Sequence, residues 1–329
     1  MTNLIAPSYV PDIAFREGTP SILFTIGSFT FYTYSLMIMS GYLASILTIL
    51  FFWKREKLKM DVLYGLILIT VPMGIIGSRL GFVFEELIYS PNPFLGSAWY
   101  AIWDGGLSIQ GGVFFTMIAD LIYAYTKRDQ IDIRKGISII IPTILVGQFL
   151  GRFGNYGNRE VYGKIDWTGA SSIIFGKSFA NNLYISDSYT DALGLKGAYR
   201  YPLFLYEGLA NLVGYLLIVW VFNLLWTFKP GATAGLYLLW YGILRLALEP
   251  LRQESYLYYS IIAIGFAIAI GMLIFIYYQF WGRITYKTTY YKKIFKHYEY
   301  EYPEYYIAYV KRTTFTHLFK RVLSYTWVR

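Results

Sequence analysis

Cysteine is absent from the 329 residues, histidine occurs twice, and charged residues make up only 15% of the chain. Without cysteine the chain can form no disulfide, no thiolate metal site and no cysteine nucleophile of its own. With only His297 and His317, it also lacks the ligands for a multi-histidine metal site. An average soluble domain carries about 25% charged residues. The scarcity of charge therefore argues against a water-soluble enzyme.

Hydrophobic residues, by contrast, make up 56% of the chain and occur in long runs. A membrane helix needs about 20 mostly apolar residues, so the runs predict an all-α, polytopic transmembrane helix bundle. We expect about seven spans, the first of which is long and begins in an interfacial segment. No basic region precedes that span and no cleavage site follows it, so we expect an anchor helix. The spans lie near residues 22–53, 62–78, 107–126, 136–151, 203–227, 232–249 and 257–281.

Lysine and arginine cluster after alternate spans, in residues 54–59, in residues 127–135 and in the tail from residue 282. Such clusters mark cytoplasmic loops. We therefore expect an extracytoplasmic N-terminus, an extracytoplasmic loop region over residues 152–202 and a cytoplasmic C-terminus. Residues 1–281 would form a transmembrane catalytic domain, and residues 282–329 a basic, tyrosine-rich tail.

The tail carries most of the net charge of +9. An anionic membrane surface is its expected partner, because each basic residue near such a surface contributes about 1 kcal/mol of attraction. Interleaved basic and aromatic residues also occur in nucleic-acid-binding proteins. That alternative is weaker, and we expect no nucleic-acid partner.

Ionisable residues inside or at the mouths of membrane spans are candidate functional residues, because burying them is costly. Arg152 and Glu160 lie in a glycine-rich stretch after the fourth span, and Glu207 lies early in the fifth. Tyr241, Arg245 and Glu249 recur every fourth residue and share one helical face. Two alternatives need no function: Arg245 and Glu249 could pair within the membrane, and Arg152 could snorkel to the interface. Together, however, the arginines fit a lipid phosphate, with the glutamates orienting them or acting as acids or bases.

A second glycine-rich stretch, residues 104–112, enters the third span. Its two glycine pairs allow either close helix packing or a backbone turn around a lipid headgroup. Packing is the favoured alternative.

The stretch from Gly151 to Gly163 closely resembles the signature of prolipoprotein diacylglyceryl transferases, G-R-x-G-N-(F/Y)-x-N-x-E-x-x-G. Four further segments are similar to motifs of that family: Tyr34 to Met37, Gly105 to Gly112, Tyr201 to Glu207, and Tyr241 to Gln253. The resemblance covers residues 28 to 255 or so, and the tail has no counterpart.

This resemblance implies an enzyme of the bacterial cell membrane. It would move the diacylglyceryl group of phosphatidylglycerol onto the lipobox cysteine of a prolipoprotein signal peptide, forming a thioether and releasing glycerol phosphate without a cofactor. Arg152 and Arg245 would hold the phosphate and stabilise its growing charge. Glu160, Tyr241 and Glu249 complete the expected catalytic set. The expected substrate-binding residues are Tyr34, Gln110, Gly111, Gly112, Asn155, Asn158, Gly163, Tyr206 and Glu207.

One departure affects the mechanism: Gln110 stands where the family usually has the histidine assigned as general base. Glutamine accepts no proton at useful pH. Either Glu160 or Glu249 takes the proton, or the substrate phosphate does, or the chain has lost activity but kept the lipid site. We expect an active enzyme, because both arginine motifs are intact. The alternatives from other classes are a lipid transporter or flippase and a catalytically silent lipid-binding scaffold.

Overall fold

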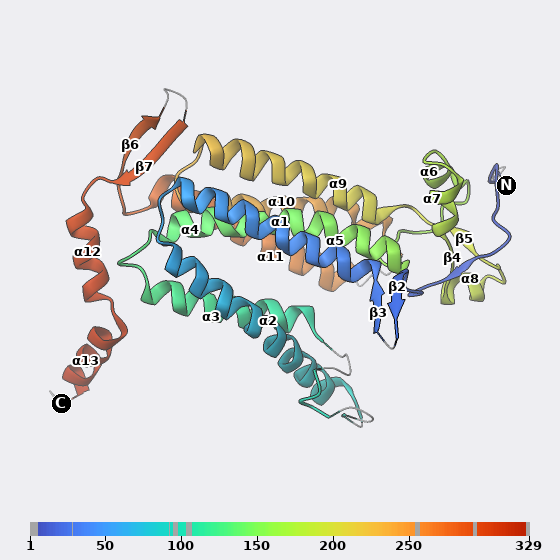
Figure 1. Cartoon of the computed structure of the whole chain (residues 1–329), viewed down its shortest axis with the longest axis horizontal. Coiled ribbons are helices and arrows are strands. Elements are labelled where there is room, and N and C mark those ends of the chain that lie inside the picture. The colour runs from blue at the N-terminus through green and yellow to red at the C-terminus, as the bar shows by residue number, and fades with distance from the viewer. Residues whose placement is uncertain are drawn as a thin grey trace. The chain divides into compact units, whose positions relative to one another are not determined.

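The computed structural model describes residues 6–27, 29–91, 93–94, 98–102, 107–253, 257–291 and 295–326 (Figure 1). The chain divides into two compact units. The first contains Met1–Phe52, Ile137–Arg283 and Thr288–Tyr298, and the second contains Trp53–Gly136, Ile284–Lys287 and Glu299–Arg329.

Long apolar helices dominate the structure, which confirms an all-α polytopic membrane protein. Within the described residues, five helical stretches are long and apolar enough to cross a membrane: Thr33–Arg55, Met60–Tyr89, Ile133–Asn158, Leu203–Asn223 and Ser260–Trp281. The other two expected spans correspond to α3 (Ile109–Thr126, 18 residues) and α10 (Ala232–Leu248, 17 residues). Because both lie at the short end of the range for spanning helices, the count of seven stays a prediction.

The first unit is a bundle built on α1 (Thr33–Arg55), α5 (Ile144–Asn158), α9 (Leu203–Tyr215), α10 and α11 (Leu257–Ile276) (Figure 1). Two of these helices continue as π-helices, Leu216–Asn223 after α9 and Tyr277–Trp281 after α11. Glycines bring neighbouring helices together: a Cβ at Gly41 of α1 would lie 3.1 Å from the Cα of Gly147 on α5. Close backbone approach through small residues is a common way for membrane helices to pack.

The fourth span is longer than expected. Helix α4 (Ile133–Ile140), a 3₁₀ turn (Ile141–Thr143) and α5 form one helical stretch. Residues 152–158, expected to begin the outer loop region, are therefore the last two turns of α5. Their polar composition suggested a loop. They form a helix instead, and its burial at Gly154 and Gly157 shows that packing stabilises it. The helix ends where Arg159 adopts a left-handed conformation with φ of 55°.

Residues 22–32, expected as the interfacial start of the first span, instead form an antiparallel hairpin of β2 (Ile22–Ile26) and β3 (Phe29–Tyr32). Aromatic and β-branched residues favour strands, and Gly27 adopts the positive φ that a turn requires. The sequence after Arg159 folds into α6 (Ala170–Ile173), α7 (Lys177–Asn182) and α8 (Ser188–Ala192). Strands β1 (Phe15–Arg16), β4 (Tyr184–Ser186) and β5 (Ala198–Tyr199) form a sheet in the order β1-β4-β5.

The second unit contains the pair of α2 (Met60–Tyr89) and α3, which meet through glycine. A Cβ at Gly111 would lie 2.5 Å from the Cα of Gly81, and one at Gly112 would lie 2.3 Å from the Oγ of Ser78. These distances confirm that Gly111 and Gly112 pack closely against α2. The first glycine pair of this motif, Gly105 and Gly106, lies outside the described residues.

The tail forms β6 (Tyr286–Tyr291), β7 (Phe295–Tyr300), α12 (Pro303–Arg312) and α13 (Phe315–Thr326). Within the second unit, hydrogen bonds connect part of the tail to the basic loop after α3. Arg128 donates hydrogen bonds to both oxygens of Thr313, and the Tyr286 hydroxyl donates one to Asp132.

Candidate active site

The C-terminal end of α5 and the start of α9 bring two charged residues of the expected site together. The Arg152 guanidinium forms an ion pair with Glu207 through Nη2 and donates a hydrogen bond of 3.3 Å from Nη1 to the Asn155 side chain. Glu207 is buried, with 3% of its surface exposed. The two helices pack against each other here, since a Cβ at Gly208 would lie 3.5 Å from the Cβ of Arg152, in ordinary van der Waals contact.

A second arginine shares the Glu207 carboxylate. The Nη2 of Arg252 lies 3.4 Å from Oε2 of Glu207, while Arg152 contacts the other oxygen. The two guanidiniums and one carboxylate leave one net positive charge. The Nε atoms of both arginines are buried and have no hydrogen-bond partner among the described residues. A buried donor without a partner is costly, and an anionic ligand with several oxygens would satisfy these donors.

Backbone contacts fix the position of Arg252, which follows the 3₁₀ turn Glu249–Leu251. Gly163 forms an antiparallel bridge with Arg252, and the Lys164 amide donates to the Leu251 carbonyl at 2.8 Å. A Cβ at Gly163 would lie 2.8 Å from that carbonyl oxygen. The last glycine of the signature is thus needed for close backbone approach at the arginine cluster.

Two charged groups at the end of α10, Arg245 and Glu249, form no ion pair with the residues that the structure describes. Glu249 is 5% exposed, yet neither of its carboxylate oxygens has a hydrogen-bond partner among the described residues. Arg245, one turn earlier, is half-buried and forms no ion pair with it. The alternative of a self-neutralising pair within the membrane is therefore wrong. Both groups remain available to a ligand.

A side-chain hydrogen bond joins α5 to α10. The Gln148 amide of α5 lies 3.4 Å from the Tyr237 hydroxyl of α10. Residues four apart on a helix lie on the same face. Arg152 follows Gln148 at that spacing, and Tyr241 follows Tyr237, with Arg245 one further turn along. Arg152 and Arg245 therefore lie on the helical faces that carry this hydrogen bond.

Tyr34 lies beside the signature helix, because a Cβ at Gly154 would lie 2.8 Å from its ring. Its hydroxyl interacts electrostatically with both Arg152 and Glu160. Glu160 accepts a hydrogen bond of 3.5 Å from the Asn158 amide. These residues extend the polar cluster towards α1.

Other expected residues lie elsewhere. Tyr206 is half-buried on α9, where its backbone amide donates to the Pro202 carbonyl at 3.2 Å. Gln110 is exposed on α3, and it belongs, with Gly111 and Gly112, to the second unit. Their participation in substrate binding stays a prediction.

Sequence reasoning matched Arg252 to a family motif without giving it a role. A signal was present, since a second arginine follows Arg245 by seven residues, or about two helical turns. What the sequence did not show is the shared carboxylate, because Glu207 and Arg252 are 45 residues apart in the chain.

Comparison with known proteins identifies the family of this chain. The family model described as prolipoprotein diacylglyceryl transferase matches residues 21–281. A phosphatidylglycerol–prolipoprotein diacylglyceryl transferase of Mycoplasmopsis pulmonis is 51% identical over 269 residues, covering 82% of each chain. A protein of the same name from Streptococcus pneumoniae (strain Hungary19A-6) is 32% identical over 267 residues, which are 78% of this chain and 93% of that protein. The chain therefore belongs to the prolipoprotein diacylglyceryl transferase family of membrane enzymes.

Proposed function

We propose that this protein transfers the diacylglyceryl group of phosphatidylglycerol to the lipobox cysteine thiol of prolipoproteins. The observation that carries the proposal is the cluster of Arg152, Glu207 and Arg252, with its net positive charge and unpartnered buried donors. A lipid phosphate supplies the charge and the acceptor oxygens that the cluster lacks. The names of the relatives specify the same two substrates.

In the proposed reaction the cysteine thiol loses its proton and the thiolate attacks the glyceryl carbon that bears the phosphate. A C–S bond forms and the C–O bond to the phosphate breaks. The electron pair of that bond stays on the phosphate oxygen, so glycerol phosphate leaves. Arg152, Arg245 and Arg252 would stabilise this developing charge. Asn155, Asn158 and Tyr34 would orient the headgroup, and Tyr241 would support Arg245.

We assign the proton acceptor to Glu249, because Gln110 cannot fill that role. Both oxygens of Glu249 lack a partner among the described residues, whereas Glu160 already accepts a hydrogen bond from Asn158. An acceptor with free lone pairs beside the phosphate-binding arginines has the placement that a general base requires.

The direct test mixes purified protein, phosphatidylglycerol vesicles and a peptide with a lipobox cysteine, and measures the peptide mass. We expect an increase equal to one diacylglyceryl group. A peptide with serine in place of the cysteine should stay unmodified. Unchanged peptide, under conditions in which the Streptococcus pneumoniae relative modifies it, would contradict the proposal. Phosphatidylglycerol crossing the bilayer without peptide modification would favour a flippase. Binding of phosphatidylglycerol alone would favour a silent scaffold.

We further propose that the protein lies in the bacterial cell membrane with its N-terminus outside and its C-terminus in the cytoplasm. The basic clusters support this orientation. Since the chain has no cysteine, single cysteines can be introduced without background. In intact spheroplasts, a membrane-impermeant maleimide should label Ala192→Cys, while Tyr305→Cys should react only after permeabilisation. Labelling of Tyr305→Cys in intact cells would reverse the orientation.

The tail, in this orientation, would lie against anionic headgroups. Helix α12 ends in Lys311 and Arg312, and Tyr305 and Phe319 expose 71% and 65% of their surface. A fluorophore on Tyr305→Cys should come closer to membranes that contain anionic lipid than to zwitterionic membranes. High salt should remove the difference, because it screens exposed charges. Equal distances in both membranes would contradict this role.

A further inference from the structure

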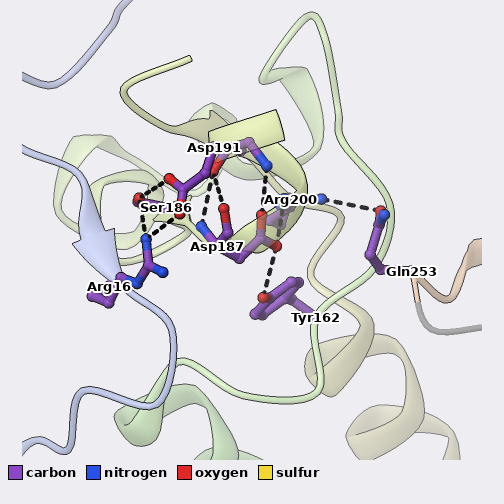
Figure 2. A network of polar contacts seen from close by, with 8 residues as sticks. Arg16, Tyr162, Ser186, Asp187, Asp191, Arg200 and Gln253 are labelled. Carbon is purple, nitrogen blue, oxygen red and sulfur yellow. Dashed lines mark hydrogen bonds and ion pairs between the residues drawn. The ribbon is translucent and has the colours of Figure 1, made fainter. Parts of the chain in front are cut away.

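A second polar network lies beside the proposed site. Arg200 is completely buried, and its guanidinium donates from Nη2 to Oδ2 of Asp187 at 2.6 Å and from Nη1 to Oε1 of Gln253 at 3.1 Å. The Tyr162 hydroxyl donates to the same Asp187 oxygen at 2.9 Å. Figure 2 shows Arg200 between Asp187 on one side and Gln253 on the other. The transfer reaction, as proposed above, uses none of these four residues.

The network joins the folded outer segment to the residue that follows Arg252. Arg200 comes directly after β5, whereas Gln253 follows the 3₁₀ turn after α10. Backbone bonds place both beside the same stretch: Gly163 donates to the Tyr201 carbonyl at 2.9 Å, and Lys164 donates to the Leu251 carbonyl at 2.8 Å. The three segments are thus held together on both sides of Arg252.

The stability of the fold does not by itself require this arrangement. Removing two charges from water is expensive, and well-packed apolar residues of similar size are often as stable as a buried ion pair. Asp187 already has donors besides Arg200, namely Tyr162 and the Thr190 backbone amide. The contribution specific to Arg200 is the hydrogen bond that its second guanidinium nitrogen, Nη1, donates to Gln253.

We propose that Arg200 is a positioning residue for the phosphate site, acting through Gln253 to hold Arg252 against Glu207. The proposal rests on the proposed function. Contacts connect Arg200 to Gln253, and, through the adjoining Arg252, to Glu207 and Arg152. If the Gln253 contact is lost, the segment carrying Arg252 is released on one side. Arg252 then contributes less to phosphate binding, while Arg245 on α10 and Glu249 at the start of the following 3₁₀ turn keep their places.

The test compares Gln253→Leu, which removes the acceptor for Arg200, with Tyr162→Phe, which removes one hydrogen bond from the same network on the side away from Gln253. KM for phosphatidylglycerol and kcat are measured in the peptide transfer assay, and the thermal midpoint is measured for each variant. For Gln253→Leu we expect KM to rise about tenfold, the size of one lost charge-assisted hydrogen bond, with kcat changed less than about threefold. For Tyr162→Phe we expect a lower thermal midpoint with unchanged KM.

Gln253→Glu keeps an acceptor oxygen at the same distance from the backbone and should restore KM to within about threefold of the unmodified protein. A KM unchanged in Gln253→Leu, or raised equally in Tyr162→Phe, would overturn the positioning role. If Gln253→Leu does not fold, Arg200→Lys replaces it. A single ammonium cannot reproduce the two arms of the guanidinium, so KM should again rise, and an unchanged KM would again overturn the role.

In these outcomes the unmodified protein still transfers lipid and the proposed function stands. If the unmodified protein fails to transfer lipid, the proposed function falls and this role falls with it.

Discussion

The two glycine-rich motifs of this chain have similar composition but different surroundings. On α5, a Cβ at Gly154 would lie 2.8 Å from the Tyr34 ring, and on α3 a Cβ at Gly111 would lie 2.5 Å from the Cα of Gly81. Both are sites of close packing. Around the α5 motif, however, Arg152, Glu207 and Arg252 gather, whereas the nearest neighbours of Gly111 are backbone atoms of α2. Glycine spacing therefore predicts close contact between segments, and only the ionisable side chains beside it indicate a candidate site.

Arg152→Ala should produce the largest change, because it removes donors from the phosphate and leaves Glu207 with one partner. We expect kcat/KM to fall by about 10² to 10³, as for other groups that stabilise charge in a transition state. Arg159→Ala is the matched control within the same motif. Arg159 donates to the Thr19 carbonyl at 2.7 Å and packs over the Phe15 ring, so its loss should lower the thermal midpoint and leave kcat/KM within a fewfold. Equal losses in the two variants would contradict the distinction between charge and packing.

Glu249→Gln should have the next largest effect, since it removes the proposed proton acceptor and keeps the shape of the side chain. We expect a loss of about 10², the lower end of what general-base catalysis is typically worth, and it should appear in kcat. Glu160→Gln, at a carboxylate that already has a hydrogen-bond partner, should reduce the rate far less. If Glu160→Gln is the more damaging change, the two roles must be exchanged. If neither variant loses activity, the substrate phosphate becomes the better candidate for the proton acceptor.

The sequence predicted most of the site because its residues lie in local motifs. Arg152 and Asn155 share one helical face, as the spacing of the signature requires. Gly163 is separate from that helix, yet its place in the motif is explained by its bridge to Arg252. Residues that act together through local spacing or a family pattern can be identified without a structure.

The remaining features depend on contacts between distant parts of the chain. Nothing near Glu207 in the sequence shows that Arg252 shares its carboxylate, and nothing near Arg200 shows that it is fully buried. The hairpin of residues 22–32 was hidden because hydropathy does not separate an apolar strand pair from the start of a long helix. The end of the fourth span was set too early for the opposite reason, since polar residues after Gly151 lower hydropathy but continue α5.

The glycine motif of α3, which packs against α2, predicts a smaller effect, and this effect is on stability. In Gly81→Ala the new methyl group would lie 2.6 Å from the Cα of Gly111, so α2 and α3 must separate. Overpacking of this kind costs about 1–3 kcal/mol, which should lower the thermal midpoint. Gly265→Ala on α11, where a Cβ would meet nothing within 4 Å, should leave the midpoint unchanged or raise it, because alanine favours the helix. A Gly81→Ala protein as stable as Gly265→Ala would show that the α2–α3 contact is loose.

Acid should lower the stability of residues 184–200 more than that of the α2–α3 pair. This is the smallest of the expected effects. Burial alone would raise the pKa of Asp187, but the Thr190 amide and the charge of Arg200 outweigh burial and lower it below the ordinary value of 3.8. A carboxylate whose pKa is lower in the folded than in the unfolded chain stabilises the fold above the unfolded pKa, and this stability is lost as the pH falls through the folded pKa. Hydrogen exchange, corrected for its intrinsic pH dependence, should therefore show unchanged protection of residues 184–200 from pH 7 to 5 and a decline below about pH 4. The α2–α3 pair has carboxyl groups too: Glu85 accepts from the Ser108 hydroxyl and Asp120 accepts from the Thr70 hydroxyl. Neither forms an ion pair among the described residues, so protection of α3 should decline less. Equal loss in both regions would mean that acid unfolds the chain as a whole and that the charged network gives residues 184–200 no separate sensitivity.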